Sequence, residues 1–316
     1  MHPLALACAL LTPAPETGTV HFTPADDQQE VPRLYRLAPR PFDYTMKWMY
    51  NLPGYDIGVY DVRFPSAVES PTPENNTVYC EYYRPEGKGP FPCVIVLDIT
   101  GGDQSVSRVL CTHLSRHGVA GLFVQMAYYG PRRPPGSKLR LLSTDMFQTA
   151  AAIRQTVLDL RLATAWMESR PEIDAKRLGI LGTSLGSFLA SLAAEMEPKL
   201  GRVALLLSGG GFIDGYYDNP RAAEYRKFYE LLGGSKDKLA KIIAPYDPIT
   251  CAASLKSRKV LMLEAMHDEI VPPKMGEAMW RACGEPEIHW YNSGHYTSVI
   301  YLADGLERVV KHFAAE

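Results

Sequence analysis

The stretch RLGILGTSLGSFLASLAA, residues 177–194, has the pattern of a strand, a sharp turn and a helix. Residues 178–181 are apolar, residues 182–186 read Gly-Thr-Ser-Leu-Gly, and residues 188–194 have the composition of a buried helix. The two glycines leave room for the neighbouring strand and helix, so Ser184 is expected to stand exposed in a strained turn. Alone, the pattern also fits a structural Ser/Gly turn between two buried elements, and the flanking sequence has to separate the two interpretations.

Strands and helices alternate on both sides of this turn. Apolar strands are predicted over residues 93–97, 119–126, 177–181, 203–207, 260–263 and 287–291, and helices over residues 105–117, 144–169, 274–281 and 297–314. Near-continuous apolar strands separated by helices indicate an α/β protein with a mostly parallel sheet covered on both faces. Residues 58–64 and 77–83 alternate in polarity around a turn-rich spacer, which predicts an antiparallel pair at the sheet edge.

The domain organisation follows from the segments that break this alternation. Residues 1–55 are expected to form an N-terminal arm, and residues 56–316 the main domain. Residues 1–15 resemble the latter part of a secretory signal peptide without its charged start, so an incomplete export signal and a packed terminal segment both stay open. The protein is accordingly cytoplasmic or exported. Residues 209–257 form an insertion where caps, lids and substrate pockets occur.

Composition excludes several classes of protein. The 316 residues carry a net charge of −2 with no basic block, which argues against nucleic-acid binding. No apolar run approaches the roughly 20 residues of a membrane-spanning helix. The six cysteines are scattered without a C-x-x-C pair, so mostly free thiols are expected rather than a disulfide framework, and a single bridge stays open. The sequence carries no signal for an oligomeric state.

A nucleophilic serine requires a histidine base, and the histidine requires an acid that holds its tautomer. His295 is the best placed of eight histidines, because it follows the last predicted strand and opens the last helix. Asp268 follows the strand 260–263 by a short loop. The order Ser184, Asp268, His295 is that of α/β-hydrolases.

Other roles for these residues remain open at this level. His295 also fits a surface or helix-capping histidine, and Asp268 a cap for the helix that begins near residue 272. Glu264 and Glu269 are carboxylates near Asp268, and Asp214 is a further substitute for the acid.

The three motifs together resemble the α/β-hydrolase superfamily, and within it the dienelactone-hydrolase-like and acetyl-esterase-like branches. The resemblance covers residues 56–314 and rests on the serine turn, the Asp268-Glu-Ile-Val-Pro-Pro stretch and the Ser293-Gly-His295 stretch. It implies the α/β-hydrolase fold and a serine esterase that forms an acyl-enzyme on a small-molecule ester. It implies no metal and no organic cofactor.

An oxyanion hole is expected beside the serine, because attack on an ester places negative charge on the carbonyl oxygen. The amide of Leu185 at the start of the helix is one expected donor. The second is expected from Thr100 or Gly101, in a loop where the family often has His-Gly and this chain does not. The Gly101-Gly102 pair also fits a plain tight turn.

Four residues are expected to line a substrate pocket. Tyr128 and Tyr129 follow a predicted strand and would form an aromatic wall, while Arg132 would meet a carboxylate of the substrate. A proline-stiffened surface loop with solvated arginines fits the same residues. Phe212 belongs to an aromatic group in the insertion.

Two alternative functions fit the same sequence features. A serine peptidase of the prolyl-oligopeptidase type shares the order of the three residues, but such enzymes usually carry a large extra domain for which the arm is too short. A non-catalytic α/β-hydrolase-fold protein would use the pocket for binding or the arm for association.

Overall fold

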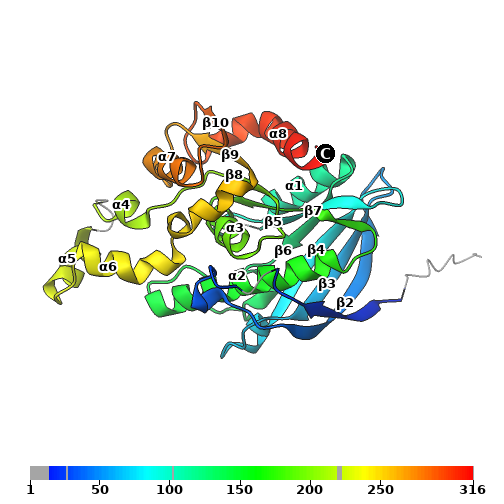
Figure 1. Ribbon diagram of the computed structural model, residues 1–316, viewed down its shortest axis with the longest axis horizontal. Coiled ribbons are helices and arrows are strands. Elements are labelled where there is room, and N and C mark those ends of the chain that lie inside the picture. Colours follow the sequence, from blue (N-terminus) through cyan, green and yellow to red (C-terminus); the bar gives the residue numbers. More distant parts are fainter. Residues whose placement is uncertain (1–13, 26–27, 102, 219–222, 316) are drawn as a thin grey trace, which may run out of the picture.

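The computed structural model describes residues 14–25, 28–101, 103–218 and 223–315. These residues contain one ten-stranded sheet with the order β1-β2-β3-β4-β6-β5-β7-β8-β9-β10 (Figure 1). The strands are β1 (Glu16–Phe22), β2 (Arg40–Asn51), β3 (Gly58–Pro65), β4 (Thr77–Arg84), β5 (Phe91–Leu97), β6 (Ala120–Val124), β7 (Ile173–Thr183), β8 (Arg202–Leu206), β9 (Lys259–Ala265) and β10 (Glu287–Tyr291). Most of the signal-like segment 1–15, and Gly102, lie outside the described residues.

The sheet combines an antiparallel edge with a parallel body. Strands β1 to β4 each run antiparallel to their neighbours, and β4 is also antiparallel to β6. From β6 through β5, β7, β8 and β9 to β10, every pair is parallel. The predicted α/β class, the mostly parallel sheet and the antiparallel edge are therefore confirmed.

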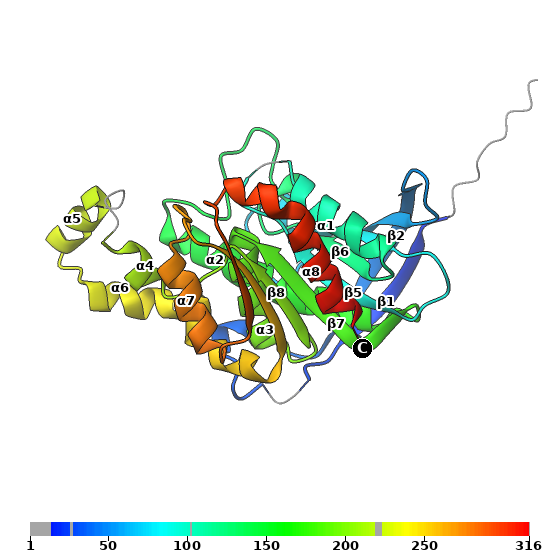
Figure 2. The same ribbon diagram turned by 90° about the horizontal axis from the view of Figure 1, so that it is seen from above.

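Helices cover both faces of the sheet (Figures 1 and 2). The helices α1 (Ser105–Arg116) and α8 (Leu302–Ala314) pack on one face, and α2 (Met146–Glu168), α3 (Leu185–Met196) and α7 (Pro273–Ala282) on the other. In β5, residues 93, 95 and 97 face the core beneath α2 and α3, whereas residues 94 and 96 face α1 and α8. Because both faces are covered, this strand is apolar at every position, which explains its continuous pattern.

The segment expected to be an N-terminal arm contributes β1 and β2, the two strands at one edge of the sheet. In β2, the side chains of Phe42, Tyr44 and Met46 alternate into the core. The hydroxyl of Tyr44 donates to Glu16 of β1 at 2.6 Å and accepts from Arg170 at 2.8 Å, which ties the edge to the main body. The domain division at residues 55 and 56 stays a prediction.

The insertion at 209–257 lies between β8 and β9 and contains α4 (Phe212–Tyr216), α5 (Ala223–Leu231) and α6 (Lys236–Ile243). Helices α5 and α6 stand out from the rest of the molecule (Figures 1 and 2). The carboxylate of Asp247 accepts hydrogen bonds from the amides of Gly211 at 2.8 Å and Phe212 at 2.6 Å, which fixes the start of α4. A cap or lid role for the insertion stays a prediction.

The fold places three loops at one edge of the sheet. Ser184 follows β7, Asp268 follows β9 and His295 follows β10, and these strands are parallel members of one sheet. Since the carboxyl ends of parallel strands meet at the same edge, residues far apart in the sequence are brought together there.

Candidate active site

The serine turn between β7 and α3 is strained. Ser184 has φ 53° and ψ −116°, a conformation that residues with a side chain rarely adopt. Its amide donates to the carbonyl of Leu206 at 2.8 Å, which fixes the turn to the neighbouring strand β8. This contact with β8 helps to hold the serine in its strained conformation.

The glycines at 182 and 186 are required by contact distances. A Cβ on Gly182 would lie 2.1 Å from the carbonyl oxygen of Gly186, and a Cβ on Gly186 would lie 2.5 Å from that of Leu97. Neither position has room for a side chain, because both contacts are with backbone. The close approach also places the end of β5 directly beside the serine turn.

His295 connects Ser184 to Asp268. Its Nε2 lies 3.0 Å from Ser184 Oγ, and its Nδ1 lies 2.7 Å from Asp268 Oδ2. All three side chains are buried, with exposed fractions of 6% for Ser184, 6% for Asp268 and 8% for His295. The structure thus brings the three predicted residues together in the geometry that a general base and its orienting acid require.

Backbone groups hold the acid and the base in place. The other carboxylate oxygen of Asp268, Oδ1, accepts from the amides of Ile270 at 2.8 Å and Val271 at 2.7 Å. The amide of His295 donates to Glu269 Oε2 at 3.1 Å. Asp268 Oδ2 therefore remains directed at the imidazole.

Of the three other candidate acids, Glu269 contacts only the backbone amide of His295, and Glu264 and Asp214 have different surroundings. Glu264 is buried, and its carboxyl accepts from the amide and the hydroxyl of Ser208. Burial raises the pKa of Glu264 well above its usual range, and the charge of Asp268 adds to that rise. Asp214 forms an ion pair with Lys236 at 3.0 Å, and its side chain is 87% exposed. Neither carboxylate contacts His295.

The loop after β5 approaches the serine from the side opposite β8. Asp98 holds it, since its carboxylate accepts from the amides of Ile99 at 2.7 Å and Ser107 at 2.9 Å. The amide of Gly101 donates to Tyr129 Oη at 3.3 Å. Leu185 begins α3, so its amide belongs to the first turn, where amides have no partner within the helix. The assignment of Leu185, Thr100 and Gly101 to an oxyanion hole stays a prediction.

A cavity of about 470 Å³ adjoins this loop. Its lining includes Thr100, Gly101, Tyr128 and Tyr129, four of the residues predicted for the site, together with two arginines that the sequence interpretation left out. The full lining is Thr100, Gly101, Asp103, Gln104, Tyr128, Tyr129, Gly130, Arg133, Arg140 and Leu142. The cavity has the size of a small-molecule site.

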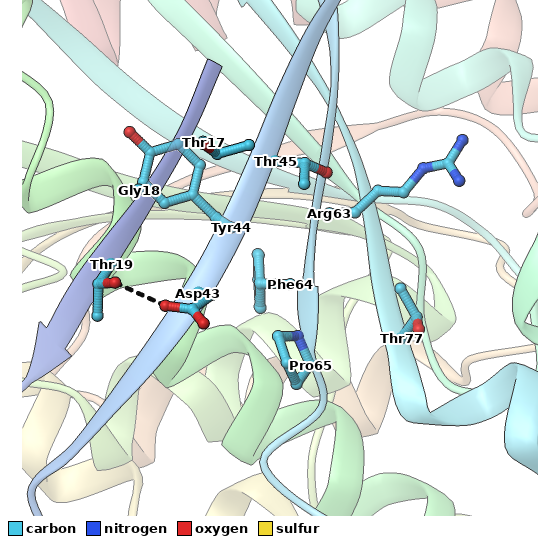
Figure 3. Close-up of a pocket in the computed structure, with 10 residues that line it drawn as sticks. All are labelled: Thr17, Gly18, Thr19, Asp43, Tyr44, Thr45, Arg63, Phe64, Pro65 and Thr77. Atoms are coloured by element: carbon cyan, nitrogen blue, oxygen red, sulfur yellow. Dashed lines mark hydrogen bonds between the residues drawn. The ribbon is translucent and has the colours of Figure 1, made fainter. Parts of the chain in front are cut away.

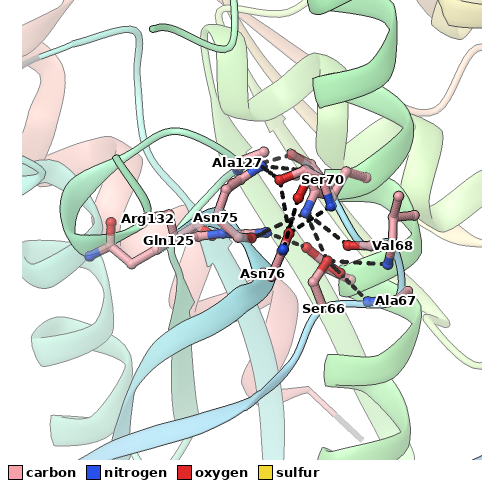
Figure 4. Close-up of polar contacts among 12 residues, drawn as sticks. Ser66, Ala67, Val68, Ser70, Asn75, Asn76, Gln125, Ala127 and Arg132 are labelled. Atoms are coloured by element: carbon pink, nitrogen blue, oxygen red, sulfur yellow. Dashed lines mark hydrogen bonds and ion pairs between the residues drawn. The ribbon is translucent and has the colours of Figure 1, made fainter. Parts of the chain in front are cut away.

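Arg132 does not lie where the sequence interpretation placed it. Its side chain is fully buried, and its guanidinium pairs with the equally buried Asp159 at 2.7 Å. It also donates to the carbonyls of Gln125 at 3.0 Å and Asn75 at 2.8 Å (Figure 4). The prediction that Arg132 meets a substrate carboxylate is therefore wrong, because its buried guanidinium is already paired with Asp159.

The polar cluster around Arg132 supports the aromatic wall of the cavity. Asn75 accepts from the amide of Tyr128 at 3.1 Å, and Tyr128 has a left-handed backbone with φ 63°. Figure 4 shows the cluster between the loop before β4, which carries Asn75, and the loop after β6, which carries Arg132. Asn75 also exchanges hydrogen bonds with Gln155 of α2. Arg132 thus helps to position Tyr128 through Asn75, and its own amide donates to the carbonyl of Tyr129 at 3.0 Å.

Phe212 packs beside the serine helix. Its ring lies 5.1 Å from that of Phe188 in α3 and 6.4 Å from that of Tyr216. Tyr216 in turn donates to the carbonyl of Ile270, two residues beyond Asp268, at 2.9 Å. The first turn of the insertion therefore contacts both α3 and the loop that carries the acid.

Residues 39–212 match the family described as alpha/beta hydrolase domain containing 18, and this match spans more than half of the 316 residues. The chain belongs to this family. Residues 152–297 of this alpha/beta hydrolase also match the prolyl oligopeptidase family, and that segment contains Ser184, Asp268 and His295.

Solved structures show the same fold. The acetyl xylan esterase from Paenibacillus sp. R4 superposes with a TM-score of 0.67 at 18% identity, covering 85% of this chain and 88% of that chain. Acetyl xylan esterase 1 from Thermoanaerobacterium sp. JW/SL YS485 has a TM-score of 0.61 at 18% identity, with 84% and 87% covered. A dienelactone hydrolase from Klebsiella pneumoniae has a TM-score of 0.54 at 21% identity, with 82% and 99% covered. The predicted α/β-hydrolase resemblance is confirmed at the level of the fold.

Two curated relatives are uncharacterised proteins of Mycobacterium tuberculosis, from strains CDC 1551 / Oshkosh and ATCC 25618 / H37Rv. Each is 26% identical over 154 residues, which cover 48% of this chain and 35% of the relative. The matched segment thus spans about a third of their length.

A second cavity, of about 480 Å³, lies on the antiparallel strands of this alpha/beta hydrolase (Figure 3). Its lining comes from β1 to β4 and includes a hydrogen bond of 2.6 Å from Thr19 Oγ1 to Asp43. It contains none of the predicted site residues and no histidine or cysteine.

The described parts of the chain show neither a metal centre nor a membrane span. In those parts, no group of three or more His, Cys, Asp and Glu side chains is arranged to hold a metal ion. Within the same residues, no helix combines the length and the apolar character needed to cross a bilayer.

Proposed function

We propose that this protein is a serine hydrolase that cleaves carboxylic esters through an acyl-enzyme formed on Ser184. The proposal rests on one observation, the hydrogen-bonded row from Ser184 Oγ through the His295 ring to Asp268, with distances of 3.0 and 2.7 Å. Hydrolase and esterase names among the structural neighbours support the same class of reaction.

Acylation begins when Ser184 Oγ attacks the ester carbonyl carbon. His295 Nε2 takes the hydroxyl proton as the carbon–oxygen bond forms, and the carbonyl oxygen becomes an oxyanion. The His295 proton then passes to the alcohol oxygen as the bond to the alcohol breaks. Asp268 keeps the imidazole in the required tautomer and stabilises its positive charge.

Deacylation uses the same residues in reverse. Water attacks the acyl carbon while His295 Nε2 takes a proton from it, and the proton is returned to Ser184 Oγ when the acid leaves. The amide of Leu185, with Thr100 or Gly101, would stabilise the oxyanion in both steps.

Replacing Ser184 tests the nucleophile. Ser184→Ala should abolish the turnover of 4-nitrophenyl acetate and the covalent labelling by a fluorophosphonate, with the fold intact by circular dichroism. Ser235→Ala is a matched control, because Ser235 also precedes a helix and its hydroxyl accepts a hydrogen bond from a backbone amide of the first turn. Full hydrolysis by Ser184→Ala, or labelling at another residue, contradicts the proposal.

A peptidase of the prolyl-oligopeptidase type is the second candidate, because residues 152–297 match that family. Ser184-dependent cleavage of a proline p-nitroanilide faster than of any ester would favour it. A protein that cleaves no ester or anilide and whose Ser184 stays unlabelled would instead be a non-catalytic binding protein.

A further inference from the structure

The loop that lines one side of the 470 Å³ cavity also passes beside the serine turn. The carbonyl oxygens of Leu97 and Asp98 lie 2.5 and 2.6 Å from the position that a Cβ on Gly186 would occupy. Thr100 and Gly101, two and three residues beyond Asp98, line the cavity. A substrate whose ester group reaches Ser184 can therefore extend along this loop into the cavity.

Among the described residues, two arginines of the cavity lining have no carboxylate partner. Arg133 forms no side-chain hydrogen bond or ion pair with any residue that the structure describes, and Arg140 donates only to the carbonyls of Ser137 and Leu139. Several arginines elsewhere are paired, including Arg108 with Glu81, Arg161 with Glu197 and Arg132 with Asp159. The cations of the cavity are thus available to a ligand.

Both arginines line the same cavity as Tyr129. Burial raises the pKa of Tyr129, and the amide of Gly101 and the positive charges of Arg140 and Arg133 oppose that rise. The acidic residue of the lining, Asp103, accepts from the amide of Ser105 at the start of α1. The cavity lining therefore combines two arginines and two tyrosines with one aspartate, whose carboxylate accepts a hydrogen bond from a backbone amide.

We propose that this cavity selects esters that carry a second, negatively charged oxyacid group, a carboxylate or a phosphate, which Arg133 and Arg140 bind. Guanidinium groups bind both anions through charge-assisted hydrogen bonds. The inference deepens the proposed ester hydrolysis and rests on it for the turnover measurements. Arg133 and Arg140 are then specificity-determining residues, in the place where Arg132 was expected.

A matched pair of esters tests the charge preference. Mono-4-nitrophenyl glutarate and 4-nitrophenyl pentanoate share the leaving group and the acyl length, and differ by a carboxylate in place of a methyl group. The wild type should prefer the glutarate ester, and Arg133→Gln combined with Arg140→Gln should lower the kcat/KM ratio of the two esters about ten-fold. Arg33→Gln, at an exposed arginine of the first 3-10 turn, changes the net charge equally and should leave the ratio as in the wild type.

Competition experiments identify the anion. Glutarate and glycerol 3-phosphate are tested as inhibitors of 4-nitrophenyl acetate hydrolysis, and the stronger inhibitor shows whether a carboxylate or a phosphate is preferred. Inhibition should weaken in the double variant and not in Arg33→Gln. If neither anion inhibits and the ester ratio does not depend on the two arginines, the proposal is overturned.

Binding without turnover separates this inference from the proposed function. Calorimetry with Ser184→Ala should detect binding of the better anion, and the double arginine substitution in that background should abolish it. Should the wild type cleave no ester while arginine-dependent binding persists, the esterase proposal fails and the anion site stands. If the protein cleaves esters, but the kcat/KM ratio of the two esters does not depend on the arginines and no anion binds, only the anion site is overturned.

Discussion

The carboxylate of Asp268 is oriented by two backbone amides. Its Oδ1 accepts from Ile270 and Val271, so Oδ2 is the oxygen that faces His295. Such a carboxylate does not need to move or exchange partners when the imidazole becomes charged. In the proposed mechanism, this fixed carboxylate stabilises the positive charge that forms on His295.

Asp268→Asn should preserve the fold and lower kcat for ester hydrolysis by about 10³- to 10⁴-fold, because an amide favours the wrong tautomer of the imidazole. Steady-state kinetics with 4-nitrophenyl acetate measure the effect. Asp145→Asn is the control, since Asp145 also accepts from two backbone amides, of Phe147 and Gln148, but has no histidine partner. Equal losses in both variants would contradict an acid role for Asp268.

The sequence was sufficient to predict which residues meet at this site, but not which arginine faces the cavity. Ser184, Asp268 and His295 each follow a parallel strand, so their convergence follows from topology alone. Arg132 and Arg133 are neighbours in one short turn, and they diverge because Asp159, 27 residues away in α2, pairs with Arg132. No local pattern contains that contact.

At the level of secondary structure, the junction of β7 and α3 depends on the absence of side chains at 182 and 186. Gly186→Ala should lower the free energy of unfolding by about 1 to 3 kcal/mol, because its Cβ would overlap the backbone of β5. It should also lower kcat, since α3 would shift away from the serine. Urea unfolding and steady-state kinetics measure the two effects.

Gly201→Ala is the control for this substitution, because the nearest atom to its Cβ position is 4.0 Å away and its φ is not positive. Equal stability of Gly186→Ala and Gly201→Ala would show that the turn tolerates a methyl group.

The buried ion pair between the loop after β6 and α2 gives a second prediction. Burial raises the pKa of Asp159 while Arg132 opposes that rise, so removing Arg132 leaves an uncompensated buried acid. Arg132→Met should lower the free energy of unfolding by about 3 to 5 kcal/mol in urea titrations. Arg281→Met breaks an exposed pair with Glu277 and should cost less than about 1 kcal/mol. Similar costs for both would contradict a role for burial.

Most of the parallel strands could be predicted because they are continuous runs of apolar residues, as in β5 and β6. The strands β1 and β2 were not predicted, although Phe42, Tyr44 and Met46 alternate into the core. Their partners are other edge strands and α2, and that packing is decided by tertiary contacts such as Tyr44 with Trp166, whose rings lie 6.2 Å apart.

For the molecule as a whole, His312 makes stability depend on pH. Burial, with the charge of Arg202 beside it, lowers the pKa of His312 from 6.5 to about 4. His312 therefore becomes protonated below pH 6.5 in the unfolded chain but only near pH 4 in the folded protein. The contribution of this group is complete above pH 6.5 and is lost as the pH falls.

His312→Gln should remove about 2 to 3 kcal/mol from the fall in the free energy of unfolding between pH 6.5 and 4. Urea unfolding at several pH values in this range measures the slope for each variant. His117→Gln, at an exposed histidine, should keep the wild-type slope. An unchanged slope in His312→Gln would show that this residue is not the source of acid sensitivity.

The loose attachment of α5 and α6 bears on how this protein diversifies. These helices contact mainly other parts of the insertion. In contrast, a Cβ at position 182 or 186 would collide with backbone atoms. Natural selection can therefore alter the length and surface of α5 and α6 at little cost to folding, while the serine turn tolerates almost no change. Under the predicted lid role of the insertion, descendants of this chain are expected to diverge in what they recognise long before they diverge in how they react with it.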